Sequence, residues 1–173
     1  ENLPVVIASA DKDFMQLVEP QISLFNPNDK SETLWSDVQV RDKTGVEPSQ
    51  IVDWLSLIGD SVDNIPGVVG VGPKTATDLL QRFGSLEEIY RRLDEIKSEK
   101  LRTNLQAAQG VTQRNQKLIR LRDDLPCVFK LEDFEVRQGC FEDLQPLLAG
   151  WGFKTLLHEL EKAQAKEVDL FEL

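Results

Sequence analysis

A glycine-rich stretch near the middle of the chain constrains the fold more than any other feature. Gly67, Gly70 and Gly72 stand close together, and Pro73 follows them directly. Glycine permits tight turns and lets a ligand approach the backbone closely, because no side chain stands in the way. Proline suits the first turn of a helix, where no amide donor is needed. The pattern therefore predicts a hairpin between two helices, over about residues 50–84.

The start of the second helix is suited to binding an anion. The amides around Lys74 to Ala76 have no acceptor within the helix, and the Lys74 ammonium adds a positive charge. A phosphate group is therefore the expected ligand. A glycine-rich hairpin standing alone is more often a simple turn, so the phosphate site depends on the acidic residues beside it.

Two acidic residues precede the hairpin. Asp60 and Asp63 are three residues apart, so on a helical turn both carboxylates would project from one face and offer oxygen ligands to a divalent cation. The alternative is a turn or cap role for Asp60, because Gly-Asp-Ser and Asp-Asn are common turn sequences.

A second acidic pair lies near the start of the chain. Val5–Ala8 is apolar and β-branched, as in strands buried in parallel sheets. Asp11 and Asp13 follow it, and ligand groups in open α/β sheets gather at the carboxyl ends of strands. We therefore expect a metal site there. Asp11 could equally be the N-cap of a helix through Phe14 to Val18, and the two roles are compatible. Lys12 is expected to be a solvated or phosphate-facing charge.

Two sequence blocks carry a family resemblance. Val69-Gly70-Val71-Gly72, with the small Ala76, resembles the helix-hairpin-helix element that grips a DNA backbone phosphate. Together with the block from Ala8 to Val18, it resembles the C-terminal half of the 5′ nuclease (5′-3′ exonuclease) domain of bacterial DNA polymerase I, in the flap endonuclease family. The resemblance covers nearly the whole chain, including the closing segment from Gly152 to Leu157.

The resemblance and the pattern of elements together imply two parts. Residues 1–45 are expected to be the C-terminal part of an α/β nuclease core, a partial PIN-like (resolvase-like) sheet. Residues 46–173 are expected to be an all-α, helix-hairpin-helix (SAM-fold-like) DNA-binding region. Because the first part begins on a strand and is small for a sheet domain, we expect the chain to be truncated. The N-terminal half of the domain would then be missing.

Apolar periodicity predicts the elements within these parts. The expected strands are Val5–Ala8 and Ile22–Phe25, with Trp35–Val40 as a further strand or a turn. The expected helices are Pro48–Ile58, Thr75–Phe83 ended by Gly84, a helix capped by Ser85, and helices over 101–109, 111–121, 144–149 and 153–165.

The resemblance also implies roles for individual residues. The catalytic and metal-binding carboxylates would be Asp11, Asp13, Asp60 and Asp63, and the duplex-phosphate loop would be Gly67, Gly70, Gly72, Lys74 and Thr75. The implied cofactors are two Mg²⁺ or Mn²⁺ ions, at a site that is incomplete in this chain, and K⁺ held by hairpin carbonyls. The implied partners are duplex and 5′-flap DNA, bound without sequence preference, the missing N-terminal half, and a C-terminal polymerase domain.

Charge and composition narrow the classes of function. The chain has a net charge of −10, yet residues 64–122 carry 11 basic and 6 acidic side chains, and phosphate contacts need basic side chains. Two cysteines without paired spacing, Cys127 and Cys140, and the single histidine, His158, argue against a zinc cluster or Ser-His catalysis. With no leader and no membrane-length apolar run, we expect a bacterial cytoplasmic, nucleoid-associated location and no membrane.

The sequence therefore predicts a structure-specific 5′ nuclease domain that hydrolyses DNA phosphodiesters at 5′ ends and flaps with two divalent metals, in replication and repair. One alternative is a noncatalytic duplex-binding fragment that needs the missing half for cleavage. Another is the helix-hairpin-helix scaffold of a base-excision enzyme, in which the Asp-Lys-Asp block would have no place.

Overall fold

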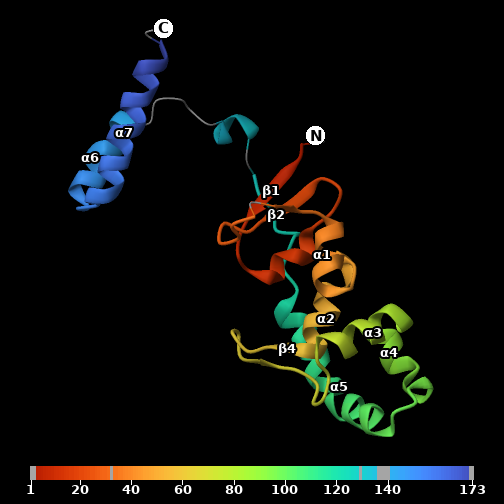
Figure 1. Ribbon diagram of the computed structural model, residues 1–173. Helices are drawn as coiled ribbons and strands as arrows, with labels where there is room; N and C mark the ends of the chain where they lie inside the picture. Colours follow the sequence, from red (N-terminus) through yellow and green to blue (C-terminus); the bar gives the residue numbers. More distant parts are fainter. Residues whose placement is uncertain (1–2, 32, 129, 136–140, 172–173) are drawn as a thin grey trace. The chain divides into compact units, whose positions relative to one another are not determined.

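The computed structural model describes residues 3–31, 33–128, 130–135 and 141–171 of the chain. By the contacts between its residues, the chain divides into two compact units, Glu1–Asp124 and Leu125–Leu173. Every candidate site residue lies in the first unit, whose elements are shown in Figure 1. The division predicted near Gly45 is a boundary in sequence pattern and stays a prediction.

A small mixed sheet opens the first unit. β1 (Val5–Ala8) and β2 (Ile22–Phe25) pair in parallel, and β3 (Leu34–Trp35) pairs with β2 in antiparallel orientation. Both predicted strands are thus confirmed. The expected burial of the first strand is wrong, because Val5 and Val6 are 48% and 51% exposed. These side chains are exposed because β1 lies at one edge of the sheet, whose strand order is β1-β2-β3.

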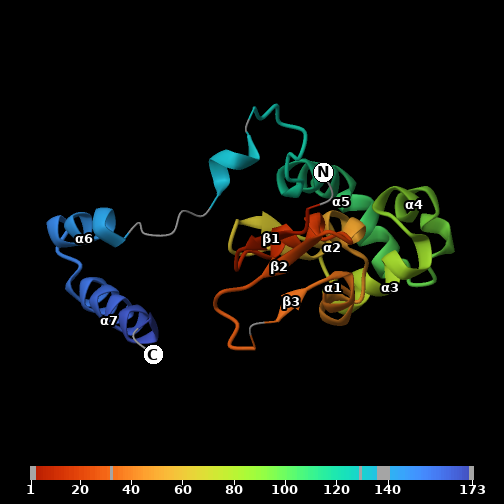
Figure 2. The ribbon, with the colours of Figure 1, turned by 90° about the horizontal axis from the view of Figure 1, so that it is seen from above.

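Helices make up most of this unit. They are the short 3₁₀ helices η1 (Lys12–Leu17), η2 (Pro48–Gln50) and η3 (Leu93–Glu95), and the α-helices α1 (Asp37–Thr44), α2 (Ile51–Ile58), α3 (Pro73–Phe83), α4 (Leu86–Arg91) and α5 (Glu99–Ile119). α2 is the central one, because it packs against α3, α5 and η1. Its Ile51, Leu55 and Leu57 side chains are completely buried. Figure 2 shows α2 between the sheet and the helices α3 to α5.

α1 stands where a strand or a turn was expected from Trp35 to Val40. β3 ends at Trp35, and a capping box then starts the helix. The Ser36 hydroxyl accepts a hydrogen bond from the Val38 amide at 3.3 Å, and the Ser36 amide donates to Gln39 Oε1 at 2.8 Å. The local Ser-x-x-Gln signal therefore prevailed over the apolar residues of the segment.

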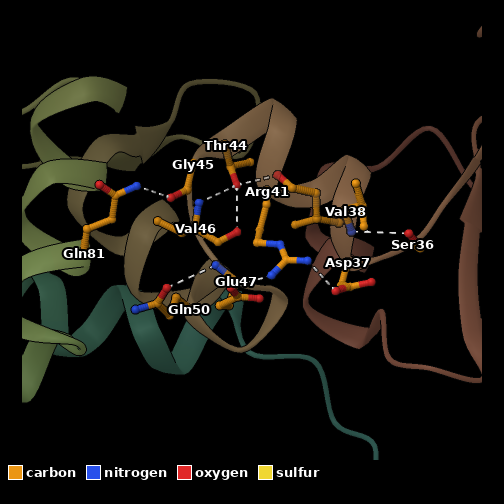
Figure 3. A network of polar contacts seen from close by, with 11 residues as sticks. Ser36, Asp37, Val38, Arg41, Thr44, Gly45, Val46, Glu47, Gln50 and Gln81 are labelled. Atoms are coloured by element: carbon orange, nitrogen blue, oxygen red, sulfur yellow. Dashed lines mark hydrogen bonds and ion pairs between the residues drawn. The ribbon is translucent and has the colours of Figure 1, made fainter.

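A polar joint ties the end of α1 to α3 (Figure 3). Gly45 has a φ of 77°, and its carbonyl accepts a hydrogen bond from Gln81 Nε2 at 2.7 Å. The Thr77 hydroxyl donates to the Thr44 carbonyl at 2.7 Å and accepts from Trp54 Nε1 at 3.0 Å. The segments on either side of Gly45 are therefore packed as one unit.

α5 is a single helix of 21 residues, where two helices separated at Gly110 were expected. A glycine inside a helix costs about 1 kcal/mol relative to alanine. That cost is small beside the burial of Leu105, Thr112 and Ile119 along one face of α5. Gly110 therefore stays within the helix and does not end it.

The second unit contains η4 (Leu131–Phe134), α6 (Phe141–Gly150) and α7 (Lys154–Phe171). The helices expected over 144–149 and 153–165 are confirmed, and both are longer than predicted. Cys127 is exposed, and Cys140 lies outside the described residues. None of the described helices combines the length and the apolar character that crossing a membrane requires.

Candidate functional site

The Asp-Lys-Asp block forms the start of η1, directly after β1. Asp11 is the N-cap of this helix, and its Oδ1 accepts a hydrogen bond from the Asp13 amide at 3.0 Å. The Asp11 amide in turn donates to Ser9 Oγ at 3.1 Å. The cap role is thus confirmed, and Asp11 remains exposed enough to take a ligand as well.

Asp60 lies in a small β-hairpin that follows α2. β4 (Gly59–Asp60) pairs with β5 (Ile65–Pro66), and residues 61–64 form the turn between them. The expected helical turn from Asp60 to Asp63 is therefore wrong. Asp60 instead stabilises the turn of the β-hairpin, because its Oδ1 accepts a hydrogen bond from the Val62 amide at 2.9 Å.

Asp60 is buried and is bonded to a lysine. Its side chain is 5% exposed, and its Oδ2 lies 2.7 Å from the Lys12 ammonium. The hydrogen bond from Lys12 is the main cause that lowers the pKa of Asp60 below its usual value, with the Val62 amide acting in the same direction against the effect of burial. Asp60 is therefore ionised near neutral pH.

Asp13 has the opposite electrostatic situation. The pKa of Asp13 is raised from 3.8 to about 6. Burial is the main cause, and the negative charges of Asp11, Asp60 and Asp63 act in the same direction. Its Oδ1 is buried and has no hydrogen-bond partner among the described residues. Carboxylates from two segments some 50 residues apart in sequence thus act on one side chain.

These features fit a divalent cation held through one or two carboxylates. A buried carboxylate oxygen without a partner is costly, and a bound cation would satisfy it. Mg²⁺ is usually bound through one or two carboxylates, with waters and substrate phosphates as further ligands. Within the described ranges, no group of three or more acidic, histidine or cysteine side chains is arranged so that it could hold a metal ion by itself. The described carboxylates could therefore supply part of the ligand set of a divalent cation, and they do not enclose one by themselves.

The glycine-rich loop leads into α3 as predicted. Gly72 is the N-cap of α3 and makes no side-chain cap bond, and Pro73 occupies the first turn. Lys74 is exposed, and no ion pair within the described part of the chain involves it. Among the described residues, the first turn of α3 thus combines amides that have no acceptor within the helix with an ammonium that no carboxylate pairs with.

The three glycines of the loop have different structural reasons. A Cβ on Gly67 would lie 2.2 Å from the Ile58 carbonyl oxygen, so Gly67 is required where the base of the hairpin crosses the end of α2. Gly70 has a φ of 76°, in the left-handed region. A Cβ on Gly72 would meet nothing within 4 Å. Of these three glycines, Gly72 is thus the one for which no contact among the described residues requires the absence of a side chain. A ligand could therefore contact the backbone there.

Two asparagines of α5 donate hydrogen bonds to carbonyl groups of α2, the β4–β5 hairpin and the glycine-rich loop. Neither asparagine was identified from the sequence. Asn115 Nδ2 donates to the Ser56 carbonyl at 3.2 Å and to the Pro66 carbonyl at 2.7 Å. Asn104 Nδ2 donates to the Val69 carbonyl at 2.8 Å. Asn115 is completely buried on the apolar face of α5. An asparagine at a core-facing position of the helix, in register with Leu105 and Ile119, was the signal that could have found it.

Several basic residues of the central region are paired. Arg91 contacts Glu87 and Glu88, and Arg92 contacts Glu95. These pairs match the alternative that arginines there alternate with acidic residues on a solvated surface. A groove at the C-terminal end of α5 is lined by three further basic residues, Lys117, Arg120 and Arg122. Of these, Arg122 contacts Asp124 at 3.4 Å.

A family profile matches the helical part of the chain. The profile described as "5'-3' exonuclease, C-terminal SAM fold" matches residues 46–142, which is more than half of the chain. The match includes Asp60 and Asp63 and the whole glycine-rich loop. The SAM-fold-like character predicted for this region is thereby confirmed, and the region is mostly helical, with the small β4–β5 ladder as the exception to the expected all-α structure.

Two curated relatives match more of the chain. It is 36% identical over 173 residues to a 5'-3' exonuclease of Aquifex aeolicus, covering 99% of this chain and 58% of that protein. It is 45% identical over 134 residues to DNA polymerase I of Treponema pallidum, covering 77% of this chain and 13% of that protein. The chain thus spans less than two thirds of the length of each of these relatives.

A solved structure is similar in fold. It is described as a bacteriophage T5 flap endonuclease in a pseudo-enzyme-product complex with DNA and metal ions, and it matches with a TM-score of 0.61 at 25% identity. The match covers 67% of this chain and 42% of that chain. Profile, relatives and fold agree with the resemblance carried by the Asp-Lys-Asp block and the glycine-rich loop. The chain belongs to the 5′-3′ exonuclease family and includes its C-terminal SAM fold.

Proposed function

We propose that this chain takes part in structure-specific hydrolysis of DNA phosphodiesters at 5′ ends and flaps, as a portion of a metal-dependent 5′ nuclease. The observation that carries the proposal is the state of Asp13. Its Oδ1 is buried and has no hydrogen-bond partner in the part of the chain that the structure describes, and burial together with the charges of Asp11, Asp60 and Asp63 raises its pKa to about 6. Such an excess of negative charge is what a divalent cation would balance.

The four carboxylates have distinct parts in this proposal. Asp11, Asp13, Asp60 and Asp63 are the candidate ligands of two Mg²⁺ or Mn²⁺ ions, which when bound supply a nucleophilic water and stabilise the leaving oxygen. The Val62 amide fixes the Asp60 carboxylate, and the Asp11 side chain fixes the start of η1. A T5 5′-exonuclease of similar fold, described with divalent metal ions (zinc) bound, supports a divalent cofactor.

The start of α3 is the proposed contact with duplex DNA. The amides of Lys74 and Thr75 and the Lys74 ammonium would hold a backbone phosphate, with Gly70 and Gly72 allowing its close approach. Contacts of this type position a duplex without reading its sequence. K⁺ at the hairpin carbonyls would add to the same contact. Gly67 supports the loop from inside, at the crossing with Ile58.

The partners follow from the relatives. We propose duplex and 5′-flap DNA as substrates, an N-terminal portion of the nuclease domain that completes the metal site, and, as in the DNA polymerase I relatives, a polymerase domain in the same protein. Residues 1–45 would belong to the nuclease core and residues 46–173 to the DNA-binding region. A bacterial, cytoplasmic and nucleoid-associated location goes with these partners.

One observation favours a second candidate, a DNA-binding fragment that does not cut. Among the described residues no three ligand side chains surround one position, whereas the start of α3 is open and carries the exposed Lys74. The hairpin would then hold duplex DNA, and cleavage would need carboxylates from additional residues.

Cleavage and binding assays separate the two candidates. Flap cleavage with Mg²⁺ is measured for the 173-residue chain and for a version extended upstream, each with and without Asp13→Ala. Cleavage by the 173-residue chain itself that disappears with Asp13→Ala supports the nuclease. Duplex binding by the 173-residue chain, with cleavage only in the extended version, supports the second candidate.

Salt dependence tests the phosphate contact separately. Lys74→Ala should weaken duplex binding for all sequences alike and reduce the salt slope by about one phosphate contact. Arg91→Ala is the matched control, because Arg91 is already paired with two glutamates and should leave the slope unchanged. A sequence-dependent loss for Lys74→Ala would argue against contact with the backbone.

A further inference from the structure

Lys12 makes the one close ion pair of the candidate metal site among the residues that the structure describes. Its ammonium lies 2.7 Å from Asp60 Oδ2 and links η1 to the β4–β5 hairpin across 48 positions of sequence. The two partners differ in exposure, since the Lys12 side chain is 39% exposed and Asp60 is 5% exposed. One end of the pair is therefore fixed, and the other is free to leave.

The hydrogen bonds of Asp60 leave little room for a further ligand. Oδ1 accepts from the Val62 amide at 2.9 Å, and Oδ2 is held by Lys12. The Val62 bond lies within the turn of the hairpin and can persist when a ligand binds. The Lys12 bond cannot persist unchanged, because a divalent cation on Oδ2 would bring two cations, the metal ion and the ammonium, to one carboxylate oxygen.

We propose that Lys12 is a displaceable counter-ion, which holds Asp60 in the metal-free chain and competes with a divalent cation for that carboxylate. This inference rests on the metal site of the proposed function. It makes Lys12 a positioning residue that sets how tightly the site takes its metal. A lysine suits the task because its point charge sits on a flexible stem and forms no bidentate clamp.

The structure also offers the displaced ammonium a place to go. Lys12 lines a groove together with Asn26, Trp35, Lys43 and Asp29, a carboxylate outside the four candidate metal ligands. Swinging from Asp60 into this groove keeps the ammonium near a carboxylate and in contact with solvent. The change then needs only rotation of the Lys12 side chain, because η1 and the hairpin are held by their own backbone contacts.

Two readouts with opposite signs test the inference on the 173-residue chain. In Lys12→Met the thermal unfolding midpoint of the metal-free protein should fall, because the buried Asp60 loses its partner. The affinity for Mn²⁺, measured by calorimetry, should rise about tenfold, because a competing charge has gone. A salt bridge that only supports the fold would lower both. Lys43→Met is the matched control in the same groove, and Lys12→Arg keeps the charge; neither should gain affinity.

A direct readout covers the case in which Lys12→Met does not fold. The ¹⁵Nζ resonance of the wild-type Lys12 ammonium, assigned by its loss in Lys12→Arg, should be protected from exchange without metal and should lose that protection when Mg²⁺ is added. A resonance that is unchanged by saturating Mg²⁺ would overturn the inference, as would unchanged or weaker Mn²⁺ binding by a folded Lys12→Met.

Failure of the inference and failure of the metal site are distinguishable. If the wild type binds Mn²⁺, Asp60→Asn abolishes binding and Lys12→Met changes nothing, only the role of Lys12 is wrong. If neither the wild type nor Lys12→Met binds Mn²⁺, both in the 173-residue chain and in a version extended upstream, the metal site and the inference fall together.

Discussion

Asp13 and Asp60 share one neighbourhood of negative charge, yet their carboxyl groups respond in opposite directions. Asp60 has Lys12 and the Val62 amide as partners, and its pKa is lowered. Asp13 has a buried oxygen without a partner, and its pKa is raised to about 6. The direction is set by the partners of each oxygen and not by burial alone, because burial acts on both in the same sense.

The raised pKa of Asp13 predicts a pH-dependent effect of Asp13→Asn on the metal-free chain. The folded state binds the Asp13 proton more tightly than the unfolded state, so ionisation destabilises the fold as pH rises from about 4 through about 6. Asp13→Asn removes this penalty. We expect a gain of about 1 kcal/mol at pH 7.5, after allowance for solvent screening, and almost none at pH 4.

Urea unfolding at the two pH values, with chelator present, measures this difference. Mn²⁺ should stabilise the wild type at pH 7.5 and stabilise Asp13→Asn much less. A variant that is destabilised equally at both pH values would show that Asp13 is a structural hydrogen-bonding residue and that its charge is not the issue.

At the scale of elements, the β4–β5 hairpin is the part that sequence patterns described least well. The spacing of Asp60 and Asp63 matches a helical turn, but the structure has a two-stranded ladder there. The ladder depends on Asn115 of the distant α5 and on the close crossing of Gly59 and Gly67. Such contacts join residues far apart in sequence, so a local periodicity cannot reveal them.

The glycines of this hairpin give a matched pair of substitutions. Gly67→Ala should destabilise the chain by about 2–4 kcal/mol, because its Cβ would lie 2.2 Å from the Ile58 carbonyl oxygen and the backbone must shift. Gly72→Ala should cost about 1 kcal/mol or less, since its Cβ meets nothing within 4 Å. Gly72→Ala should nevertheless weaken duplex binding.

Urea unfolding and duplex-binding isotherms on both variants test this division of roles. If Gly67→Ala keeps full stability and loses DNA binding, Gly67 touches DNA and its internal role is wrong. Full DNA binding by Gly72→Ala would show that no backbone phosphate approaches Gly72 closely.

The joint after α1 predicts a second graded pair. Gly45→Ala places a Cβ 2.5 Å from Thr77 Cγ2 at a φ of 77°, whereas Gly84→Ala meets nothing within 4 Å at a φ of 88°. Backbone strain alone costs about 1 kcal/mol at each position, so the contact should make Gly45→Ala more harmful by a further 1–2 kcal/mol.

Thr77→Ser supplies the control for this pair, because it removes the Cγ2 methyl and keeps the hydroxyl that bonds the Thr44 carbonyl and Trp54. The double variant with Gly45→Ala should recover the extra loss in thermal unfolding. Equal destabilisation by Gly45→Ala and Gly84→Ala would show that the contact with Thr77 is not limiting.

At the scale of the whole molecule, the sequence was most informative where chemistry and chain geometry coincide locally. The strands Val5–Ala8 and Ile22–Phe25, the helix after Pro73 and the cap at Asp11 follow from short patterns, and each is present. The pairing of Lys12 with Asp60 could not be predicted, because it arises from the packing of η1 against α2, which leads directly into the hairpin. The candidate carboxylates were thus identifiable from sequence, and the state of each one was not.

The central claim is that the Asp-Lys-Asp block and the β4–β5 hairpin form one divalent-cation site. Calorimetric titration of Mn²⁺ into the wild type, Asp13→Asn, Asp60→Asn and the double variant tests it most directly. We expect each single substitution to weaken binding at least about tenfold and the double variant to lose much less than the sum of the two free-energy changes, because both carboxylates would act on the same ion of the proposed pair. Unchanged affinity in both single variants, or strictly additive losses, would contradict it.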